Sequence, residues 1–173
     1  PEILDQAHGI GVEYMCIETA GFSEFSEEGR KLGDTIKQKA REYGIRFVGP
    51  NGLGIINAEK RLCLPFAVLT PWEAGPVSIM AQSGGVGSSL LTGIQEHNIF
   101  ANKFVSLGNK YCIDEVDVLR YYIQDEGTRI ILMYLESIAR GREFIEAAAS
   151  SDKPILLFKS NTTTAGAARA HSH

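Results

Sequence analysis

The chain of 173 residues has few cysteines, little excess of charge of either sign and no long apolar run. Its three cysteines, Cys16, Cys63 and Cys112, lie far apart without a CxxC spacing, which argues against a disulfide framework or zinc site and favours a reducing cytoplasm. The formal net charge of −4, with acids and bases interspersed, gives no field that would attract nucleic acid or an anionic membrane. No apolar run approaches the roughly 20 residues that span a bilayer. We therefore expect no nucleic-acid partner, no membrane partner and no bound metal.

One stretch, residues 77–91, organises the rest of the sequence. Its apolar beginning breaks into small residues and then resumes with helical spacing, which predicts a strand, a tight turn and a helix. The first amides of a helix lack intrahelical partners and attract anions. An anion site is therefore expected at the turn formed by Gln82, Ser83, Gly84 and Gly85. A plain strand-to-helix turn with glycines for packing remains the alternative, because a short glycine-rich turn is a weak motif.

The remaining sequence alternates strand-like and helical patterns, as is typical of βαβ units. Before the organising stretch, a helix, strand, helix and strand are expected at residues 1–9, 12–19, 26–43 and 45–48. After it, strands are expected at 103–107, 129–135 and 154–158, the last two buried, and helices at 114–124 and 143–150. Residues 55–76 show little periodicity, so the boundary between two units is placed there. The expected fold class is α/β, with two adjacent doubly wound parallel sheets.

Functional side chains gather at the carboxyl ends of strands in such sheets. The residues at these ends include Glu18, Thr19, Pro50, Asn51, Gln82, Ser83, Ser106, Asn109, Glu136, Ser137, Lys159 and Ser160. Glu136 stands out because it directly follows the apolar run 129–135, where a carboxylate is partly desolvated and needs a partner. The alternative is a glutamate that reaches solvent, as most charged side chains do.

The C-terminal residues 162–173 are rich in Thr, Ala, Gly and Ser, a composition typical of a flexible segment. They contain His171 and His173, for which such a segment offers no obvious structural task. A solvated tail residue and the start of a purification tag are the competing interpretations, although His-Ser-His without a further run is a poor tag. The residues alone leave the role of these histidines open.

Seven stretches together carry a resemblance to a known family: GFSEFSEEG, RFVGPNGLGIIN, AQSGGVG, FVSLGNKYCIDEVDVL, IILMYLES, KPILLFKS and AGAARAHSH. In this order they resemble the alpha-type portion of the NDP-forming acyl-CoA synthetases, which include ADP-forming acetyl-CoA synthetase and, more distantly, the succinyl-CoA synthetase alpha subunit. The resemblance implies the last part of a Rossmann-like CoA-binding domain, residues 1–70, followed by a flavodoxin-like ligase domain, residues 71–173. The family's glycine-rich CoA phosphate loop would lie upstream of Pro1, so the sequence is expected to be a truncated piece of a larger enzyme.

The resemblance also implies roles for individual residues. The family motif resembles Ser-His-Thr-Gly, whose histidine carries phosphate, and Ser172 and His173 match its first two residues. His173 is therefore the expected phosphohistidine, with Glu136 orienting its imidazole. The turn at Gln82, Ser83, Gly84 and Gly85 would bind the phosphoryl group. The residues expected to face CoA and the acyl group are Thr19, Gly21, Pro50, Asn51 and Asn109.

The implied reaction interconverts acyl-CoA, phosphate and ADP with free acid, coenzyme A and ATP, through acyl phosphate and phosphohistidine. ATP or ADP with Mg would bind an ATP-grasp module, fused or separate, which nothing in this sequence resembles, so the piece alone is expected to be inactive. The resemblance is compatible with a homo-oligomer. Two alternatives stay open: a CoA-sensing, synthetase-like regulatory part of a multidomain protein acetyltransferase, and a non-catalytic CoA- or phosphate-binding module.

Overall fold

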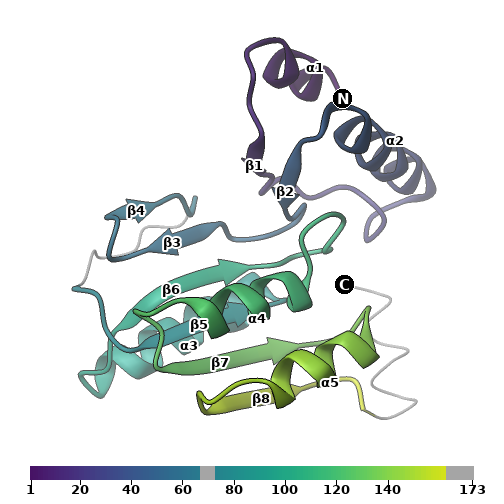
Figure 1. The fold of residues 1–173 in the computed structure, drawn as a ribbon. Helices are drawn as coiled ribbons and strands as arrows, with labels where there is room; N and C mark the ends of the chain where they lie inside the picture. Colours follow the sequence, from purple (N-terminus) through teal and green to yellow (C-terminus); the bar gives the residue numbers. More distant parts are fainter. Residues whose placement is uncertain (67–72, 163–173) are drawn as a thin grey trace.

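The computed structural model describes residues 1–66 and 73–162, which form a small N-terminal unit beside a larger sheet flanked by helices (Figure 1). The N-terminal unit consists of α1 (Glu2–Gly9), β1 (Tyr14–Cys16), α2 (Glu27–Tyr43) and β2 (Arg46–Val48). The two strands pair in parallel, with Tyr14 opposite Arg46. This arrangement confirms the βαβ unit expected from the alternation of patterns.

Local signals fix α2 at both of its ends. The Ser26 hydroxyl accepts a hydrogen bond from the Gly29 amide at 3.0 Å and caps the N-terminus, and Gly44 in the left-handed conformation ends the helix. Between the caps, Ile36 and Ala40 are buried in the same apolar cluster as Phe47 of β2. This core is small, but it holds the ends of β1 and β2 in place beside the larger sheet.

Within the described residues, the larger sheet has six strands in the order β4-β3-β6-β5-β7-β8. Its parallel part contains the four strands expected from the sequence, which are β5 (Val77–Ala81), β6 (Ala101–Ser106), β7 (Ile130–Leu135) and β8 (Ile155–Lys159). The helices between them are α3 (Gly84–Glu96), α4 (Glu115–Gln124) and α5 (Gly141–Ala149). Each lies within a few residues of its expected position.

The expectation of a purely parallel second sheet is wrong at one edge. Within residues 55–76, where the sequence shows little periodicity, β3 (Ile55–Asn57) pairs antiparallel with β6, and β4 (Leu62–Cys63) pairs antiparallel with β3. These strands are too short to show an alternating pattern, and β3 is held by a partner strand far along the chain. The chain therefore enters the larger sheet before the organising stretch begins.

Apolar side chains fill both faces of the parallel part of the sheet. On the face that carries α4 and α5, Met80 and Met133 belong to one buried cluster with Leu119 and Phe144. On the other face, which carries α3, Ile79 and Leu132 pack in a second cluster with Leu91. Figure 1 shows α4 and α5 in front of the strands and α3 behind them. The sheet is thus doubly wound, as expected.

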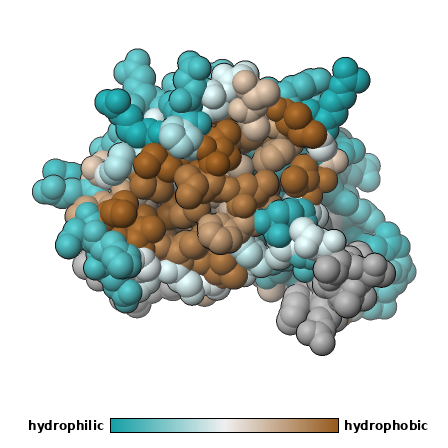
Figure 2. Space-filling view, turned by 90° about the horizontal axis from the view of Figure 1, so that it is seen from below, coloured by the Kyte–Doolittle hydropathy of each residue, from teal (hydrophilic) through white to brown (hydrophobic). Residues whose placement is uncertain are grey.

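The prediction that residues 154–158 form a buried strand is wrong. β8 lies at the edge of the sheet, and three of its side chains are exposed, namely Leu156 at 48%, Leu157 at 39% and Phe158 at 59%. Figure 2, seen from the side on which β8 lies in Figure 1, shows a broad hydrophobic area on this face. An apolar sequence alone does not reveal whether a strand is central or at an edge, because both positions use the same residue types.

Candidate functional site

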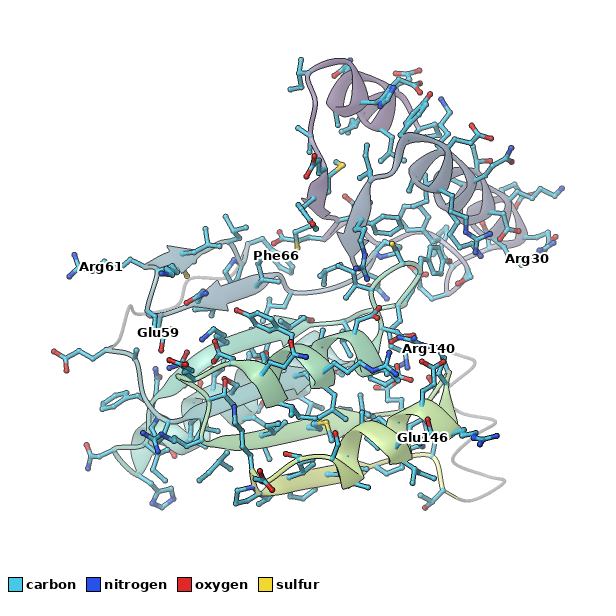
Figure 3. The ribbon with its side chains drawn as sticks, in the orientation of Figure 1. Arg30, Glu59, Arg61, Phe66, Arg140 and Glu146 are labelled. Carbon is cyan, nitrogen blue, oxygen red and sulfur yellow. The ribbon has the colours of Figure 1, made fainter. Side chains whose placement is uncertain are left out.

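A cavity of about 520 Å³ lies where the N-terminal unit meets the larger sheet. It is lined by residues from four parts of the chain: Glu18 and Ala20 after β1, Asn51, Gly52 and Leu53 after β2, Phe66 after β4, and Gly84, Gly85 and Ser88 of α3. Figure 3 shows Phe66 at this junction, between β1 and the hairpin of β3 and β4. The cavity therefore joins the expected anion-binding turn to the Pro50–Asn51 loop.

The first turn of α3 presents its backbone to this cavity. Ser83 is the N-cap residue, and its hydroxyl accepts a hydrogen bond from the Val86 amide at 3.4 Å. Gly84 and Gly85 are the first two helical residues, so their amides have no intrahelical partner. The positive end of the helix dipole adds to these free N–H groups. The geometry gives an anion two backbone donors, and neither Gly84 nor Gly85 carries a side chain that would block access to them.

Glu18 lies in the wall of the same cavity, whose other lining residues include Leu53 and Phe66. Burial raises the pKa of Glu18 above its ordinary value. A carboxyl with a raised pKa can hold or release a proton nearer to neutral pH. The sequence analysis places Glu18 at a strand end without giving it a role. The residues that share the cavity with Glu18 are distant in the sequence, so no local pattern connects them with it.

The structure brings together the loops that carry the residues expected to face CoA and the acyl group, which are Thr19, Gly21, Pro50, Asn51 and Asn109. The Asn51 amide donates to the Thr19 carbonyl at 3.0 Å, and the Asn109 amide donates to the Pro50 carbonyl at 2.8 Å. The Asn51 side-chain amide also donates to Asn109 Oδ1 at 3.3 Å. Of the five, Asn51 lines the cavity beside α3, whereas Thr19 lines a separate cavity of about 270 Å³ in the N-terminal unit.

Glu24 joins this cluster of loops although the sequence analysis gives it no role. Its carboxylate accepts hydrogen bonds from the Gly21 amide at 2.7 Å, the Phe22 amide at 3.0 Å and the Asn109 side chain at 2.5 Å. Burial works to raise the pKa of Glu24, but these donors outweigh it and hold the pKa below its ordinary value. Glu24 thus links the loop of Gly21 to the loop of Asn109 through hydrogen bonds to its carboxylate.

Gly108 allows the loop after β6 to approach the loop after β2. Its φ of 57° lies in the left-handed region, and a Cβ at this position would lie 2.1 Å from the Pro50 carbonyl oxygen. No residue with a side chain could take this place without moving one of the loops. The signal for this contact in the sequence is only a glycine after a strand, which many turns share.

Glu136 follows β7 directly and lies beside the organising turn. Gln82 Oε1 accepts hydrogen bonds from the amides of Glu136 and Ser137, each at 3.0 Å. Lys159 Nζ, at the end of β8, donates to the Glu136 carbonyl at 2.8 Å. The half-buried Glu136 carboxylate itself forms no hydrogen bond or ion pair with another residue of the described ranges. The structure therefore places Gln82, Glu136 and Lys159 together at one edge of the sheet.

The expected phosphohistidine and its neighbours concern residues that the structure does not describe. His171, Ser172 and His173 lie outside the described residues. Within residues 1–66 and 73–162, no group of three or more His, Cys, Asp or Glu side chains is arranged to hold a metal ion. In the same ranges, no helix combines the length and the apolar character needed to cross a membrane.

Comparison with known proteins identifies the family. The model of the succinyl-CoA ligase-like flavodoxin domain matches residues 74–173. The alpha subunit of ADP-forming acetate–CoA ligase I from Pyrococcus furiosus is 37% identical over 100% of this chain and 38% of its own length. ADP-forming acetate–CoA ligase from Methanocaldococcus jannaschii is 40% identical over 100% of this chain and 24% of its own length.

A solved structure agrees with these relatives. Dinucleotide-forming acetyl-coenzyme A synthetase 1 of Ca. Korarchaeum cryptofilum, in complex with phosphate and ADP, has a TM-score of 0.88 and 34% identity over 99% of this chain and 38% of that chain. The chain thus spans less than half the length of the proteins it resembles. Its fold, its sequence and the family match agree, and the chain belongs to the NDP-forming acyl-CoA synthetase family.

Proposed function

We propose that this chain is part of an acyl-CoA synthetase that interconverts acyl-CoA, phosphate and ADP with free acid, coenzyme A and ATP. Acyl phosphate and phosphohistidine are the intermediates. The names of the relatives, which are ADP-forming CoA ligases, support this reaction class. The single observation that carries the proposal is the cavity in which the first turn of α3 faces the Asn51 loop.

In this proposal one set of described residues binds the phosphoryl group and another set faces CoA and the acyl group. The amides of Gly84 and Gly85 bind the phosphoryl group, because free N–H groups at a helix N-terminus stabilise negative charge. The loops that carry Thr19, Gly21, Pro50, Asn51 and Asn109 face CoA and the acyl group. Glu18 supplies a carboxyl group to the cavity that contains both Asn51 and the first turn of α3.

The phosphoryl transfer is assigned to His173. Its neutral imidazole nitrogen attacks the phosphorus of acyl phosphate; a P–N bond forms, the O–P bond breaks and the free acid leaves as carboxylate. Glu136 accepts a hydrogen bond from the other ring N–H, which fixes the tautomer and stabilises the positive charge that develops on the ring. The Glu136 carboxylate, which has no partner among residues 1–66 and 73–162 and lies beside the α3 turn, supports this role.

The proposed reaction needs two further components, a nucleotide site and a CoA-binding domain. ATP or ADP with Mg binds to an ATP-grasp module, fused or separate, and coenzyme A extends over a Rossmann-like domain of which residues 1–70 are one part. The ligase domain covers residues 71–173, and the family match from residue 74 supports this limit. The three cysteines are free, which fits a cytoplasmic enzyme.

The test uses the full-length protein that contains this chain, incubated with labelled ATP and Mg. We expect an acid-labile, alkali-stable label, which His173→Ala abolishes together with net turnover, while His171→Ala is nearly silent. Glu136→Gln keeps the size of the side chain but loses its charge, and the labelling rate falls on the order of a hundredfold. Normal labelling of the His173→Ala protein would contradict the assignment. CoA binding without any label would favour a regulatory, CoA-sensing domain instead.

A further inference from the structure

A buried ion pair lies close to the candidate site and takes no part in the function proposed so far. Glu115, the first residue of α4, is fully buried, and the Lys110 side chain is only 5% exposed. Lys110 Nζ donates to Glu115 Oε2 at 2.8 Å. Removing two charges from water is costly, and such a pair persists only where further hydrogen bonds satisfy both groups.

The further hydrogen bonds of both charges go to one turn, residues 136–139. Lys110 Nζ donates to the Ser137 carbonyl at 2.8 Å and to the Ser137 hydroxyl at 3.0 Å. Glu115 Oε1 accepts from the Ala139 amide at 2.6 Å. The pair therefore binds the backbone that directly follows Glu136.

The same turn is held from several other directions. Gln82 binds the amides of Glu136 and Ser137, and Lys159 binds the Glu136 carbonyl. At its far end, Arg140 donates to Asp114 from Nε at 2.7 Å, and Figure 3 shows Arg140 near the adjoining ends of α4 and α5. The backbone N–H and C=O groups of Glu136 and Ser137 thus all form hydrogen bonds, while the Glu136 carboxylate remains without a described partner.

Lys110 also stands between two residues that contact the N-terminal unit. Asn109 donates to Glu24, and the Tyr111 hydroxyl hydrogen-bonds with the Ser23 hydroxyl at 2.6 Å. A single short loop therefore binds the N-terminal unit through Asn109 and Tyr111 and the Glu136 turn through Lys110. The loop therefore connects the N-terminal unit with the Glu136 turn through hydrogen bonds.

We propose that Lys110 and Glu115 are positioning residues that hold the Glu136 turn in the geometry its carboxylate needs, an inference that rests on the role proposed for Glu136. Neither residue touches the reacting atoms. They act through the backbone of residues 136–139. When this backbone is held in one conformation, the Glu136 side chain loses less conformational freedom on reaching the geometry that catalysis needs.

The Lys103 cluster provides a matched control. Lys103 is also a buried lysine, 4% exposed, and it forms ion pairs with Asp125 at 2.8 Å and Glu59 at 3.2 Å. It lies near the beginning of β6, at the opposite edge of the sheet from Glu136. Lys103→Met therefore breaks a buried ion pair of the same kind without touching the Glu136 turn.

The experiment compares Lys110→Met, the double variant Lys110→Met with Glu115→Gln, and Lys103→Met in the full-length protein. The double variant removes both charges together, so that no lone buried charge destabilises the fold. We expect both Lys110 variants to lower the labelling rate about 10- to 100-fold, because small displacements of a catalytic group have effects of this size. The KM for phosphate should change little, and Lys103→Met should label at the normal rate.

Hydrogen exchange of the amides of residues 136–139 gives a second measurement that does not depend on activity. Both Lys110 variants should lose protection there, and Lys103→Met should keep it. Unchanged exchange in the double variant, or a normal labelling rate with the turn unprotected, would overturn the positioning role. A wild-type protein that never becomes labelled would refute the proposed function instead, and the exchange result would still decide whether the pair holds the turn.

Discussion

The packing of α3 against the sheet can be tested by adding the same methyl group at two of its glycines. At Gly87 a Cβ would lie 2.8 Å from two ring carbons of Phe104 and 3.0 Å from the Ala81 Cβ. Both neighbours are completely buried, so neither can retreat into solvent. At Gly93, on the same helix, a Cβ would meet nothing within 4 Å.

The expected difference in stability follows directly from this contrast. Replacing Gly by Ala within a helix stabilises it by about 1 kcal/mol, and this gain is common to both variants and cancels between them. Overpacking a filled core costs about 1–3 kcal/mol, and only Gly87→Ala incurs it. Gly87→Ala should therefore be less stable than Gly93→Ala by about 2 kcal/mol, or about 4–8 °C in Tm for a chain of this size.

The assay is urea or thermal unfolding of both variants, followed by circular dichroism. A Gly87→Ala protein as stable as the Gly93→Ala protein would refute the close packing of α3 on β5 and β6. The same pair also tests the anion site, because a displaced first turn of α3 moves the amides of Gly84 and Gly85. Phosphate affinity should fall in Gly87→Ala and stay unchanged in Gly93→Ala.

Three further predictions concern the cavity, a thiol and an ion pair. In Gly85→Ala the added methyl would meet only Ser83 Oγ, at 4.0 Å, so the fold should keep its stability. The methyl would occupy space beside the cavity and keep an anion away from the helix amides, so phosphate affinity, measured by calorimetry, should fall about tenfold, which is about 1.4 kcal/mol; equal affinity would exclude the site. Burial raises the pKa of Cys16 to about 11, so mass spectrometry after alkylation at pH 8 should find it modified much more slowly than the exposed Cys63. Burial works to raise the pKa of Asp114, but the Arg140 guanidinium and two helix amides outweigh it and lower the pKa; the stabilisation is therefore complete above the unfolded value of about 4 and is lost as the pH falls through the folded pKa. Asp114→Asn should flatten the decrease in unfolding free energy between pH 7 and pH 3, and an unchanged slope would contradict this.

The parts of the fold that the sequence predicts well are those with local signals. The caps of α2, the turn before α3 and Asp114 at the start of α4 each lie within a few residues of the element they define. The antiparallel strand β3 has no such signal, since it is three residues long and its partner β6 begins more than forty residues later. Its position depends on long-range pairing, which no local pattern records.

The candidate site was predictable in the same uneven way. The rule that functional groups gather at strand ends locates Glu136 and Gln82, and the structure adds the hydrogen bond from the Glu136 amide to Gln82 Oε1. The buried pair of Lys110 and Glu115 could not be expected, because charged side chains in a polar sequence segment are usually exposed. Whether a charged side chain is buried depends on which distant segments of the chain pack over it.

The strand order explains why Gln82 and Glu136 meet at all. From β5 the chain moves through α3 to β6 on one side, and from β6 it returns through α4 to β7 on the other side of β5. β5 and β7 are therefore neighbours from which the chain departs on opposite faces, and their carboxyl ends flank the point where the winding reverses. In open α/β sheets, ligands bind at this reversal because the departing helices leave space between them. Gln82 directly follows β5 and Glu136 directly follows β7, so the order of the strands, which periodicity could not reveal, places the expected phosphoryl-binding turn and the expected partner of the histidine at one binding edge.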